Sequence, residues 1–122
     1  MSKDSAEETR ILDLDRQLNE MITQGKSVDA LQKFYAEDVV AQENDEPERV
    51  GLDTWVNARR EMERKTKKFA ARVLAHAANG DTSFSEWEYN FELEGMGAIK
   101  MIQVAVRRWK DGKVVRERFY HK

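Results

Sequence analysis

The sequence predicts an α+β protein in which three helices are followed by antiparallel strands. Two observations support this prediction. The spacing of apolar residues changes from helical to strand-like near residue 69, and glycine-containing turn motifs then separate the apolar stretches. The chain has 122 residues and a single proline, and no change of composition marks a linker. We therefore expect one domain over residues 1–122, with the helices packed on one face of an antiparallel sheet.

Three segments in the first half of the chain have apolar residues at helical spacing. Ser5 and Glu8 have the spacing of a capping box, which satisfies free amide groups at the start of a helix. Serine is a favoured N-cap residue, and we expect Ser27 to cap the start of the second helix. The predicted helices cover residues 5–25, 27–35 and 52–67.

The second half of the chain alternates between strands and tight turns. Asn79-Gly80-Asp81 and Lys110-Asp111-Gly112-Lys113 contain residues that tolerate the positive φ of hairpin turns. A shorter strand precedes the third helix, and a polar loop over residues 44–49 separates the two. The predicted strands cover residues 39–43, 69–78, 84–93, 98–109 and 114–121.

Composition argues against several kinds of site. Without cysteine, the chain has no disulfide, no thiol nucleophile and no cysteine metal ligand. His76 and His121 are its two histidines, and neither has the spacing of a metal-binding motif, so we expect no metal. No glycine-rich phosphate loop or dinucleotide-binding motif occurs, and we expect no cofactor.

Charge and hydropathy argue against two kinds of partner. The formal net charge of -2 gives no electrostatic reason to expect nucleic acid or an anionic membrane, and the basic residues 59–68 are interrupted by glutamates as on a solvated helix face. No apolar run is long enough to cross a bilayer, and nothing near the first methionine resembles a signal peptide. Together with the absence of cysteine, these features predict a cytoplasmic protein.

The alternation along the strands predicts which side chains face inward. Trp87, Tyr89 and Phe91 share one face of their strand, and glutamates occupy the other. On the last two strands the inner face would carry four polar residues, Gln103, Arg107, Glu117 and His121. Buried polar groups are costly unless they are paired or face a wet cavity, so they indicate a polar-lined pocket or an internal hydrogen-bond network. Alternatively, Arg107 and His121 reach solvent, because they lie near a strand end and the end of the chain.

The outer sheet face is expected to carry both charged and apolar residues. Glutamates of one strand and Arg116 and Arg118 of another would form cross-strand pairs. Ile102, Val104 and Val106 share this face, and an exposed apolar strip favours a partner. We therefore expect a homodimer formed through the outer sheet face.

Two stretches of the sequence carry a family resemblance. The first is Phe34-Tyr35-Ala36-Glu37-Asp38-Val39-Val40, followed by a loop to Gly51, which opens a helix. The second is Trp109-Lys110-Asp111-Gly112-Lys113-Val114, followed by Phe119-Tyr120. With the order of elements, they resemble the SnoaL-like and ketosteroid isomerase-like proteins of the nuclear transport factor 2-like superfamily.

The resemblance implies a cone-shaped, curved antiparallel sheet with three N-terminal helices enclosing a pocket, which is a cystatin-like architecture. It does not imply one activity. The fold hosts isomerases, aldol cyclases, epoxide hydrolases, dehydratases and non-catalytic binding proteins.

Transfer of the family's functional residues gives a mixed result. Glu43 falls where ketosteroid isomerases have their general base, but their oxyanion-hole positions correspond here to a residue near Asn19 and to Ala105. This difference argues against a true ketosteroid isomerase. SnoaL-type cyclases have an acidic residue on the last strand, where Glu117 is the nearest match. The Asp-Arg-Asp arrangement of limonene epoxide hydrolase-like proteins is not reproduced around Arg107.

These observations predict acid–base chemistry on a small, apolar carbonyl compound held in the pocket. Desolvation raises the pKa of a carboxyl group in an apolar pocket, which suits Glu43 and Glu117 as catalytic residues. His121 is the expected proton partner, and Gln103 is the expected hydrogen-bond donor to a substrate oxygen. The other expected substrate-binding residues are Tyr35, Trp55, Trp87, Tyr89, Phe91, Arg107 and Phe119.

A second reading is a non-catalytic module whose pocket holds a ligand or whose outer face docks a partner. Clustering of Glu43, Glu117 and Gln103 around one cavity would favour the enzyme. Pairing of these groups with arginines in a filled interior would favour the binding module. In the simplest structural reading, Glu43 is solvated at a strand end, His76 is a satisfied strand residue and the aromatic residues form a plain core.

Overall fold

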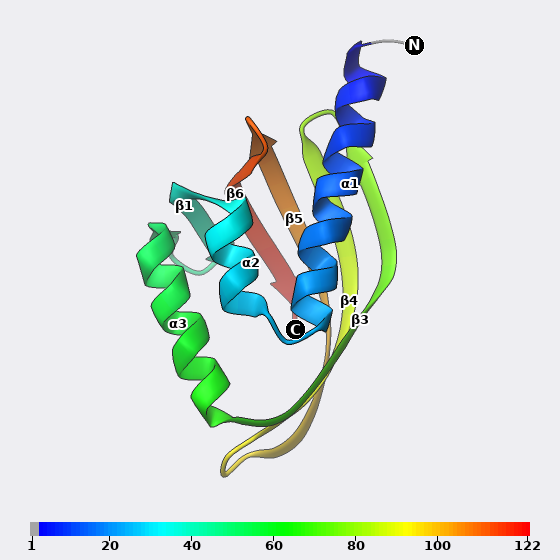
Figure 1. Cartoon of the computed structure of the whole chain (residues 1–122). Helices are drawn as coiled ribbons and strands as arrows, with labels where there is room; N and C mark the ends of the chain where they lie inside the picture. The colour runs from blue at the N-terminus through cyan, green and yellow to red at the C-terminus, as the bar shows by residue number, and fades with distance from the viewer. Residues whose placement is uncertain (1–2) are drawn as a thin grey trace.

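The chain folds as an α+β domain with three helices and six strands (Figure 1). The computed structural model describes the backbone of residues 3–122 and the side chains of residues 6–122. The helices are α1 (Lys3–Thr23), α2 (Ser27–Phe34) and α3 (Leu52–Lys65). The strands are β1 (Tyr35–Glu43), β2 (Arg49–Val50), β3 (Thr66–Asn79), β4 (Thr82–Leu93), β5 (Gly97–Lys110) and β6 (Lys113–His121).

The six strands form one sheet in the order β2-β1-β6-β5-β4-β3. Neighbouring strands are antiparallel with one exception, since β1 and β6 run parallel, with Glu43 beside Phe119. The sheet is therefore mixed, whereas the sequence predicted an antiparallel one. The hairpin turns of the second half make their strands antiparallel. No such turn joins β1 to β6, because most of the chain lies between them.

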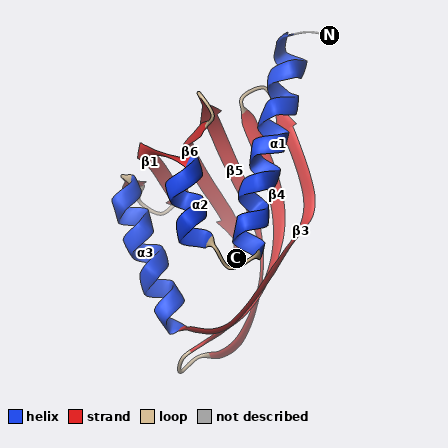
Figure 2. Ribbon diagram, in the orientation of Figure 1, coloured by secondary structure: helices blue, strands red, loops and turns tan. Residues whose placement is uncertain are grey.

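The sheet curves around the helices, which all lie on one of its faces (Figure 2). Shifts of register occur in β3 between Thr66 and Lys68 and between Val73 and Ala75. Irregularities of this kind bend a strand and increase its twist. The predicted arrangement of three helices against a curved sheet is confirmed, and the concave face is where a cavity can form.

The core lies between the helices and this concave face. Phe34 of α2 is 3% exposed and meets the ring of Trp109 edge-on at 6.3 Å. Ile11 and Leu18 of α1 and Val39 of β1 are also buried in the same cluster. Burial of such side chains contributes about 1.5–3 kcal/mol each, so this layer holds the helices on the sheet.

Several element ends differ from the sequence-based predictions. Ser27 is the first residue of α2, and Lys26 precedes it without a side-chain cap, so the predicted serine cap is wrong. Helix α1 begins at Lys3, before the predicted capping box, and the side chain of Ser5 lies outside those described. Strand β1 begins at Tyr35, earlier than the predicted residue 39. Helix α3 ends at Lys65, earlier than the predicted residue 67, and β3 begins at the next residue.

The final hairpin forms as its sequence predicts. Asp111 and Gly112 have φ angles of 52° and 77°. Positive φ at both central residues is the property of the hairpin turn that favours Asp-Gly. This turn sets the register in which β6 pairs with β5, from Lys110 beside Lys113 to Gln103 beside His121.

The outer face carries charged residues, but not in the predicted pairs. Strand β5 lies between β4 and β6, so the β4 glutamates and the β6 arginines are not cross-strand neighbours. Glu88 pairs instead with Arg72 of β3 at 3.2 Å, and Arg116 pairs with Glu48.

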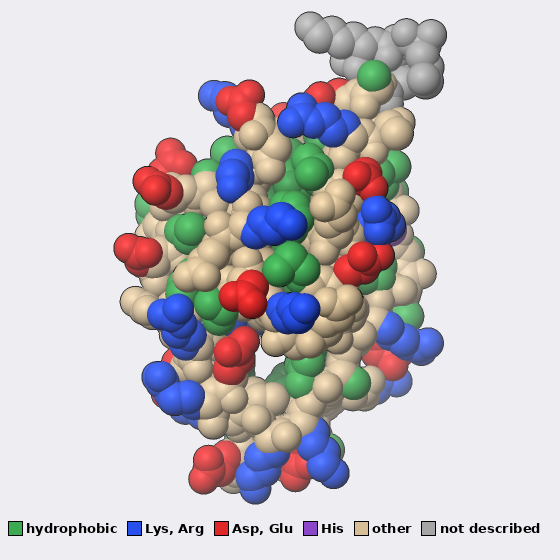
Figure 3. Space-filling view, in the orientation of Figure 1, with side chains coloured by type: hydrophobic (Ala, Val, Ile, Leu, Met, Phe, Trp, Pro, Cys, Tyr) green, Lys and Arg blue, Asp and Glu red, His purple; other side chains and the backbone are tan. Residues whose placement is uncertain are grey.

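The opposite, helical side of the molecule mixes acidic and basic side chains (Figure 3). In that view the surface is hollowed below the helices, in the region that α3 and β3 border in Figure 1. Within residues 3–122, no helix is long and apolar enough to cross a membrane.

Substitution of Phe34 tests the packing of α2 on the sheet. Phe34→Ala is expected to lower the free energy of unfolding by about 3–5 kcal/mol, because removal of the ring leaves a cavity. Phe84→Ala is the matched control, since Phe84 lies outside this core and is 38% exposed. Urea denaturation should show a much smaller loss for the control, and equal losses would contradict the described packing.

Candidate functional site

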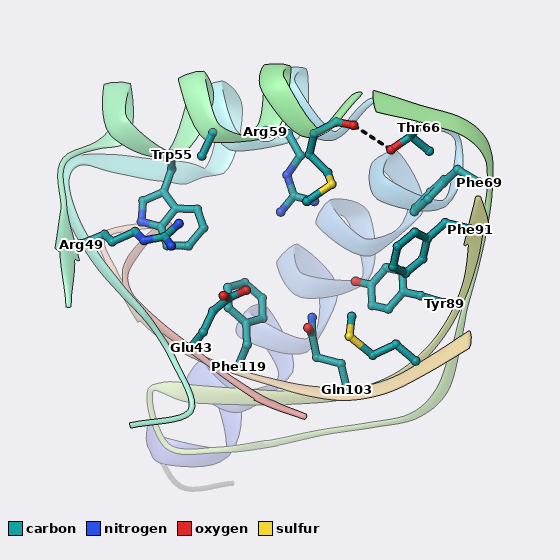
Figure 4. Close-up of a pocket in the computed structure, with 13 residues that line it drawn as sticks. Glu43, Arg49, Trp55, Arg59, Thr66, Phe69, Tyr89, Phe91, Gln103 and Phe119 are labelled. Carbon is teal, nitrogen blue, oxygen red and sulfur yellow. Dashed lines mark hydrogen bonds between the residues drawn. The ribbon is translucent and has the colours of Figure 1, made fainter. Parts of the chain in front are cut away.

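A cavity of about 290 Å³ lies between α3 and the concave face of the sheet (Figure 4). This volume is close to the lower end of the range of small-molecule sites, roughly 300–1,000 Å³. Helix α3 forms one wall, and all six strands contribute the rest. The lining residues are Glu43, Arg49, Trp55, Ala58, Arg59, Met62, Thr66, Phe69, Tyr89, Phe91, Met101, Gln103 and Phe119.

Aromatic rings make up much of the cavity wall. Trp55 and Phe119 have their ring centres 6.1 Å apart, and Phe69 and Tyr89 lie 6.0 Å apart. Trp87 stacks on Tyr89 at 5.3 Å but is not itself a lining residue. A wall of this kind favours an apolar ligand skeleton.

Two polar side chains rise from the sheet into the cavity, Glu43 from β1 and Gln103 from β5 (Figure 4). Gln103 is 6% exposed, and the Glu43 side chain is 37% exposed. The nearest ionisable partner of Glu43 is His121, whose Nε2 lies 4.0 Å from Oε1. No arginine or lysine described in the structure lies within 4.0 Å of the Glu43 carboxylate. Glu43 thus faces the cavity without a cation holding it.

Helix α3 forms the opposite wall and contributes two hydrogen-bond donors, the indole N–H of Trp55 and the guanidinium of Arg59. Trp55, Arg59 and Met62 are spaced so that they share one helix face, and all three line the cavity. Trp55 is 7% exposed, and its indole N–H has no hydrogen-bond partner among the described residues. Arg49 is exposed, and its guanidinium lies 5.4 Å from the centre of the Trp55 ring.

A small recess lies beside the cavity and shares Arg59, Tyr89 and Phe119 with it. Its volume is about 10 Å³, which is roughly the space that a single water needs. Glu117 and Arg107 line this recess, and both are buried. The interior around Glu117 is therefore filled, in contrast with the space around Glu43.

Glu117 is held by two neighbours. Its Oε2 accepts a hydrogen bond of 2.6 Å from Arg107 Nε, and the hydroxyl of Tyr35 also bonds to its carboxylate. Burial raises the pKa of Tyr35 well above its usual value, and the charge of Glu117 acts in the same direction. Tyr35 therefore stays protonated and acts as a donor to Glu117.

Arg107 connects Glu117 to a polar cluster centred on Asp15 of α1. Its Nη1 donates to Asp15 Oδ1 at 2.7 Å and to Asn19 Oδ1 at 2.6 Å. Ser83 and Ser85 of β4 each donate to the Asp15 carboxylate at 2.9 Å. These bonds join α1 to the two strands β4 and β5 in the interior.

His76 of β3 also contacts this cluster, with Nε2 2.7 Å from Asp15 Oδ2. The prediction that His76 is a satisfied strand residue is therefore confirmed. Burial alone would raise the pKa of Asp15, but the Arg107 charge and the bonds from Arg107, Ser85 and Ser83 together lower it. Asp15 is thus a buried, ionised carboxylate with most of its acceptor positions in use.

The predicted site residues fall into three groups. Glu43, Trp55, Tyr89, Phe91, Gln103 and Phe119 line the cavity. Tyr35, Arg107 and Glu117 surround the recess beside it. Trp87 and His121 line neither, although Trp87 supports Tyr89 and His121 approaches Glu43. The reading in which Arg107 reaches solvent is wrong, because its guanidinium is enclosed by the Asp15 cluster.

Sequence reasoning missed the Asp15 cluster and the inward position of Arg59. Asp15 is four residues after Ile11 and three before Leu18, so its place on the apolar face of α1 was available from the spacing. Arg59 was counted among the basic residues of a solvated helix face. Its spacing of four residues from Trp55 and three from Met62 places it on the inward face instead.

The chain matches the model of the SnoaL-like domain over residues 16–117. The chain belongs to the SnoaL-like family. The match covers all the cavity-lining residues except Phe119, and the whole Asp15 cluster except Asp15 itself, which lies one residue outside it.

Solved structures agree with this SnoaL-like assignment at the level of the fold. A proposed SnoaL-like polyketide cyclase from Jannaschia sp. CCS1 has a TM-score of 0.82 at 12% identity, covering 100% of this chain and 90% of that one. A proposed polyketide cyclase from Xanthomonas campestris pv. campestris gives 0.80 at 20% identity, with 95% and 93% covered. An LEH-like epoxide hydrolase from M. tuberculosis gives 0.79 at 16%, with 95% and 85% covered. At these identities the likeness establishes the SnoaL-like fold alone.

No curated protein sequence matches the chain significantly. Asn19 is engaged by Arg107 and Ser85, and Ala105 is a buried residue without a side-chain donor. Neither side chain therefore offers a free donor at the positions that the resemblance assigns to the isomerase oxyanion hole. Within the described part of the chain, no group of three or more His, Cys, Asp or Glu side chains is arranged to hold a metal ion.

Substitution of Asp15 tests whether its buried carboxylate is ionised and stabilising. The folded-state pKa is lowered, so the contribution is complete above the unfolded value of ~3.9 and is lost as pH falls through the folded value. Asp15→Asn should lower the free energy of unfolding by roughly 1.5–3 kcal/mol near neutral pH, because charge-assisted hydrogen bonds are lost. The difference from wild type should shrink as pH falls below about 4.

Asp13→Asn is the matched control for this experiment. Asp13 is an exposed carboxylate on the same helix, paired with Arg16 at the surface, so its loss should matter much less. Denaturant titrations at a series of pH values measure both variants. A difference between wild type and Asp15→Asn that is independent of pH would contradict an ionised Asp15.

Proposed function

We propose that this protein binds a small, mainly apolar carbonyl compound in the cavity and catalyses proton transfer with Glu43 as the base. The observation that carries this proposal is the position of Glu43, which shares an aromatic-walled cavity with Gln103 and has no arginine or lysine partner within 4.0 Å among the described side chains. The reaction class is that of a cofactor-free isomerase, cyclase or lyase.

Glu43 is a better candidate for the base than Glu117. A base must reach the proton that it abstracts, directly or through one water. Glu43 faces open space, whereas Glu117 lies beside a recess of about 10 Å³ and accepts bonds from Arg107 and Tyr35. The Oε2 atom of Glu117 is also occupied by the ion pair with Arg107. Glu117 therefore has a positioning role in this proposal.

Gln103 and His121 would support the reaction. The Gln103 side chain can donate a hydrogen bond to a substrate oxygen on which negative charge develops after proton abstraction. His121 lies 4.0 Å from Glu43 and is the nearest ionisable group that could relay its proton. In the SnoaL-like family, names such as polyketide cyclase are in keeping with enolate chemistry.

The alternative is a non-catalytic ligand-binding module of the same fold. The pairing of Glu117 with Arg107 favours it, because only one of the two expected catalytic carboxylates faces the cavity. The two functions share the cavity and differ in whether Glu43 moves a proton. An exchange measurement separates them.

Deuterium exchange tests the proposed proton transfer. The protein is incubated with cyclohexanone in D₂O, and deuterium uptake next to the carbonyl is followed by NMR. Wild type is expected to accelerate the exchange, and Glu43→Gln should lose about 10²-fold or more of that acceleration, since the amide cannot accept the proton.

Glu86→Gln is the control, because Glu86 lies on the outer side of β4, opposite to the inward-facing Trp87, and does not line the cavity. It should exchange like wild type. Equal rates for wild type and Glu43→Gln would rule out Glu43 as the base. Binding of cyclohexanone without any accelerated exchange would favour the binding module.

We also propose that the outer sheet face binds a second copy of the chain. Ile102 is 45% exposed there, and Val104 lies beside it with Tyr120 as its neighbour on β6. Acidic residues flank this strip on β4 and arginines flank it on β6. A two-fold axis along β5 would place the acidic side of one copy opposite the basic side of the other.

Substitution of Ile102 tests this contact. Ile102→Asp is expected to convert a dimer into a monomer, because it places a charge in the centre of the apolar strip. Met96→Asp is the control, since Met96 is 69% exposed in the turn between β4 and β5. Sedimentation velocity measures the mass of each form. A wild-type protein that is monomeric at all concentrations would contradict the proposed contact.

A further inference from the structure

Arg59 is a charged side chain of the cavity wall that has no ion-pair or hydrogen-bond partner among the described residues. It extends from α3 into the cavity (Figure 4), where it is half-buried among apolar and aromatic residues. Considering the side chains that the structure describes, its guanidinium forms no hydrogen bond and no ion pair within 4.0 Å. A partly buried guanidinium is costly unless an anion or hydrogen-bond acceptors compensate it. The missing acceptor is therefore expected to come from a ligand.

The nearest possible protein partner does not serve this role. Glu63 follows Arg59 by one helical turn, and both border a neighbouring hollow of about 220 Å³. A glutamate at this spacing often pairs with an arginine on a helix surface. Glu63 is exposed, however, and no ion pair between the two forms. Glu63 therefore does not neutralise the Arg59 guanidinium.

The charge balance of the cavity also favours an anion. Its lining contains two guanidinium groups, those of Arg49 and Arg59, and a single carboxylate, that of Glu43. Arg49 is exposed and lies over the Trp55 ring. Arg59 acts deeper in the molecule, since its charge reaches both Tyr35 and Tyr89. Burial nevertheless raises the pKa of Tyr89 to about 12, so this hydroxyl stays protonated.

A second unused donor lies one turn away from Arg59. The Trp55 indole N–H is buried and has no partner among the described residues, although Trp55 lines the same cavity. Buried donors of this type normally find an acceptor. Arg59 and Trp55 are thus two donors on one wall, both short of acceptors.

We propose that Arg59 binds the carboxylate of an anionic, otherwise apolar ligand, with Trp55 as an additional donor. This inference deepens the proposed function, because it uses the same cavity and specifies the substrate class as a carbonyl compound that carries an acid group. The carboxylate would lie against α3, and the reacting carbon would face Glu43 and Gln103 on the sheet (Figure 4). A planar guanidinium matches the geometry of a carboxylate and binds it with two parallel hydrogen bonds.

The test compares 3-phenylpropanoate with 3-phenylpropanamide, which share one skeleton and differ in charge. Isothermal titration calorimetry measures the affinity of each for the folded protein at the same pH and ionic strength. Wild type is expected to bind the carboxylate about tenfold or more tightly than the amide. Arg59→Met should abolish this preference, because methionine keeps the length and apolar character of the side chain without its charge.

Two further variants control this comparison. Arg60→Met removes the neighbouring charge, which is exposed and does not line the cavity, and should keep the preference. Arg59→Lys retains the charge without the planar fork and should keep part of the preference. The thermal midpoint of Arg59→Met should equal or exceed that of wild type, since an uncompensated charge has been removed.

The role of the Trp55 indole N–H is tested separately by NMR. Binding of 3-phenylpropanoate should shift the indole N–H resonance that Trp55→Phe removes from the spectrum, whereas 3-phenylpropanamide should shift it less. An unchanged Trp55 resonance at saturating carboxylate would remove Trp55 from the proposed site.

The outcomes separate this inference from the proposed proton transfer. Equal affinities of wild type for the two probes, or an unchanged preference in Arg59→Met, would overturn the role of Arg59 and leave exchange by Glu43 untouched. A clear carboxylate preference in a protein that shows no deuterium exchange would support Arg59 and reject the catalytic role of Glu43. Glu43→Gln should keep the preference in either case.

Discussion

A guanidinium buried between two carboxylates determines how the first helix sits on the sheet. Arg107 of β5 bonds to Asp15 of α1 on one side and to Glu117 of β6 on the other. Removal of one partner from such a cluster leaves an uncompensated charge in the interior, which is strongly destabilising. The three elements are therefore positioned together. The recess that Arg107 and Glu117 line is also one boundary of the cavity region, so the same bonds define where the space for a ligand ends.

The concave face of the sheet divides into a satisfied and an unsatisfied half. Around Asp15, donors from α1, β3, β4 and β5 use most of the acceptor positions. Around the cavity, Glu43, Arg59 and the indole of Trp55 lack such partners. A fold selected for stability alone would pair or exclude these groups. Their concentration around one space is the physical reason to assign that space to a ligand rather than to packing.

Periodicity was enough to predict the layers of the fold but not its less local features. The alternation along β4, β5 and β6 correctly placed Trp87, Gln103 and Glu117 on the inner face. The parallel pairing of β1 with β6 depends on contacts between distant parts of the chain, and no local pattern encodes it. Within the site, the alternation predicted the inward position of Gln103, and the family resemblance pointed to Glu43. Arg59 was missed because an arginine on a charged helix is usually solvated, and only the packed structure reveals its missing partner.

The parallel pairing of β1 with β6 has a consequence for biosynthesis. A nascent chain emerging from the ribosome can form α1 and α2 early, but β1 finds its neighbour only when the last strand has been made. Until then one edge of β1 lacks its β6 partner, and Glu43 and Trp55 face no opposing Phe119. Pairings between distant segments form slowly, and the intermediates that precede them expose hydrophobic surface and unpaired strand edges that favour aggregation. The cavity is thus a late product of folding, and it is completed only after β6 has been translated.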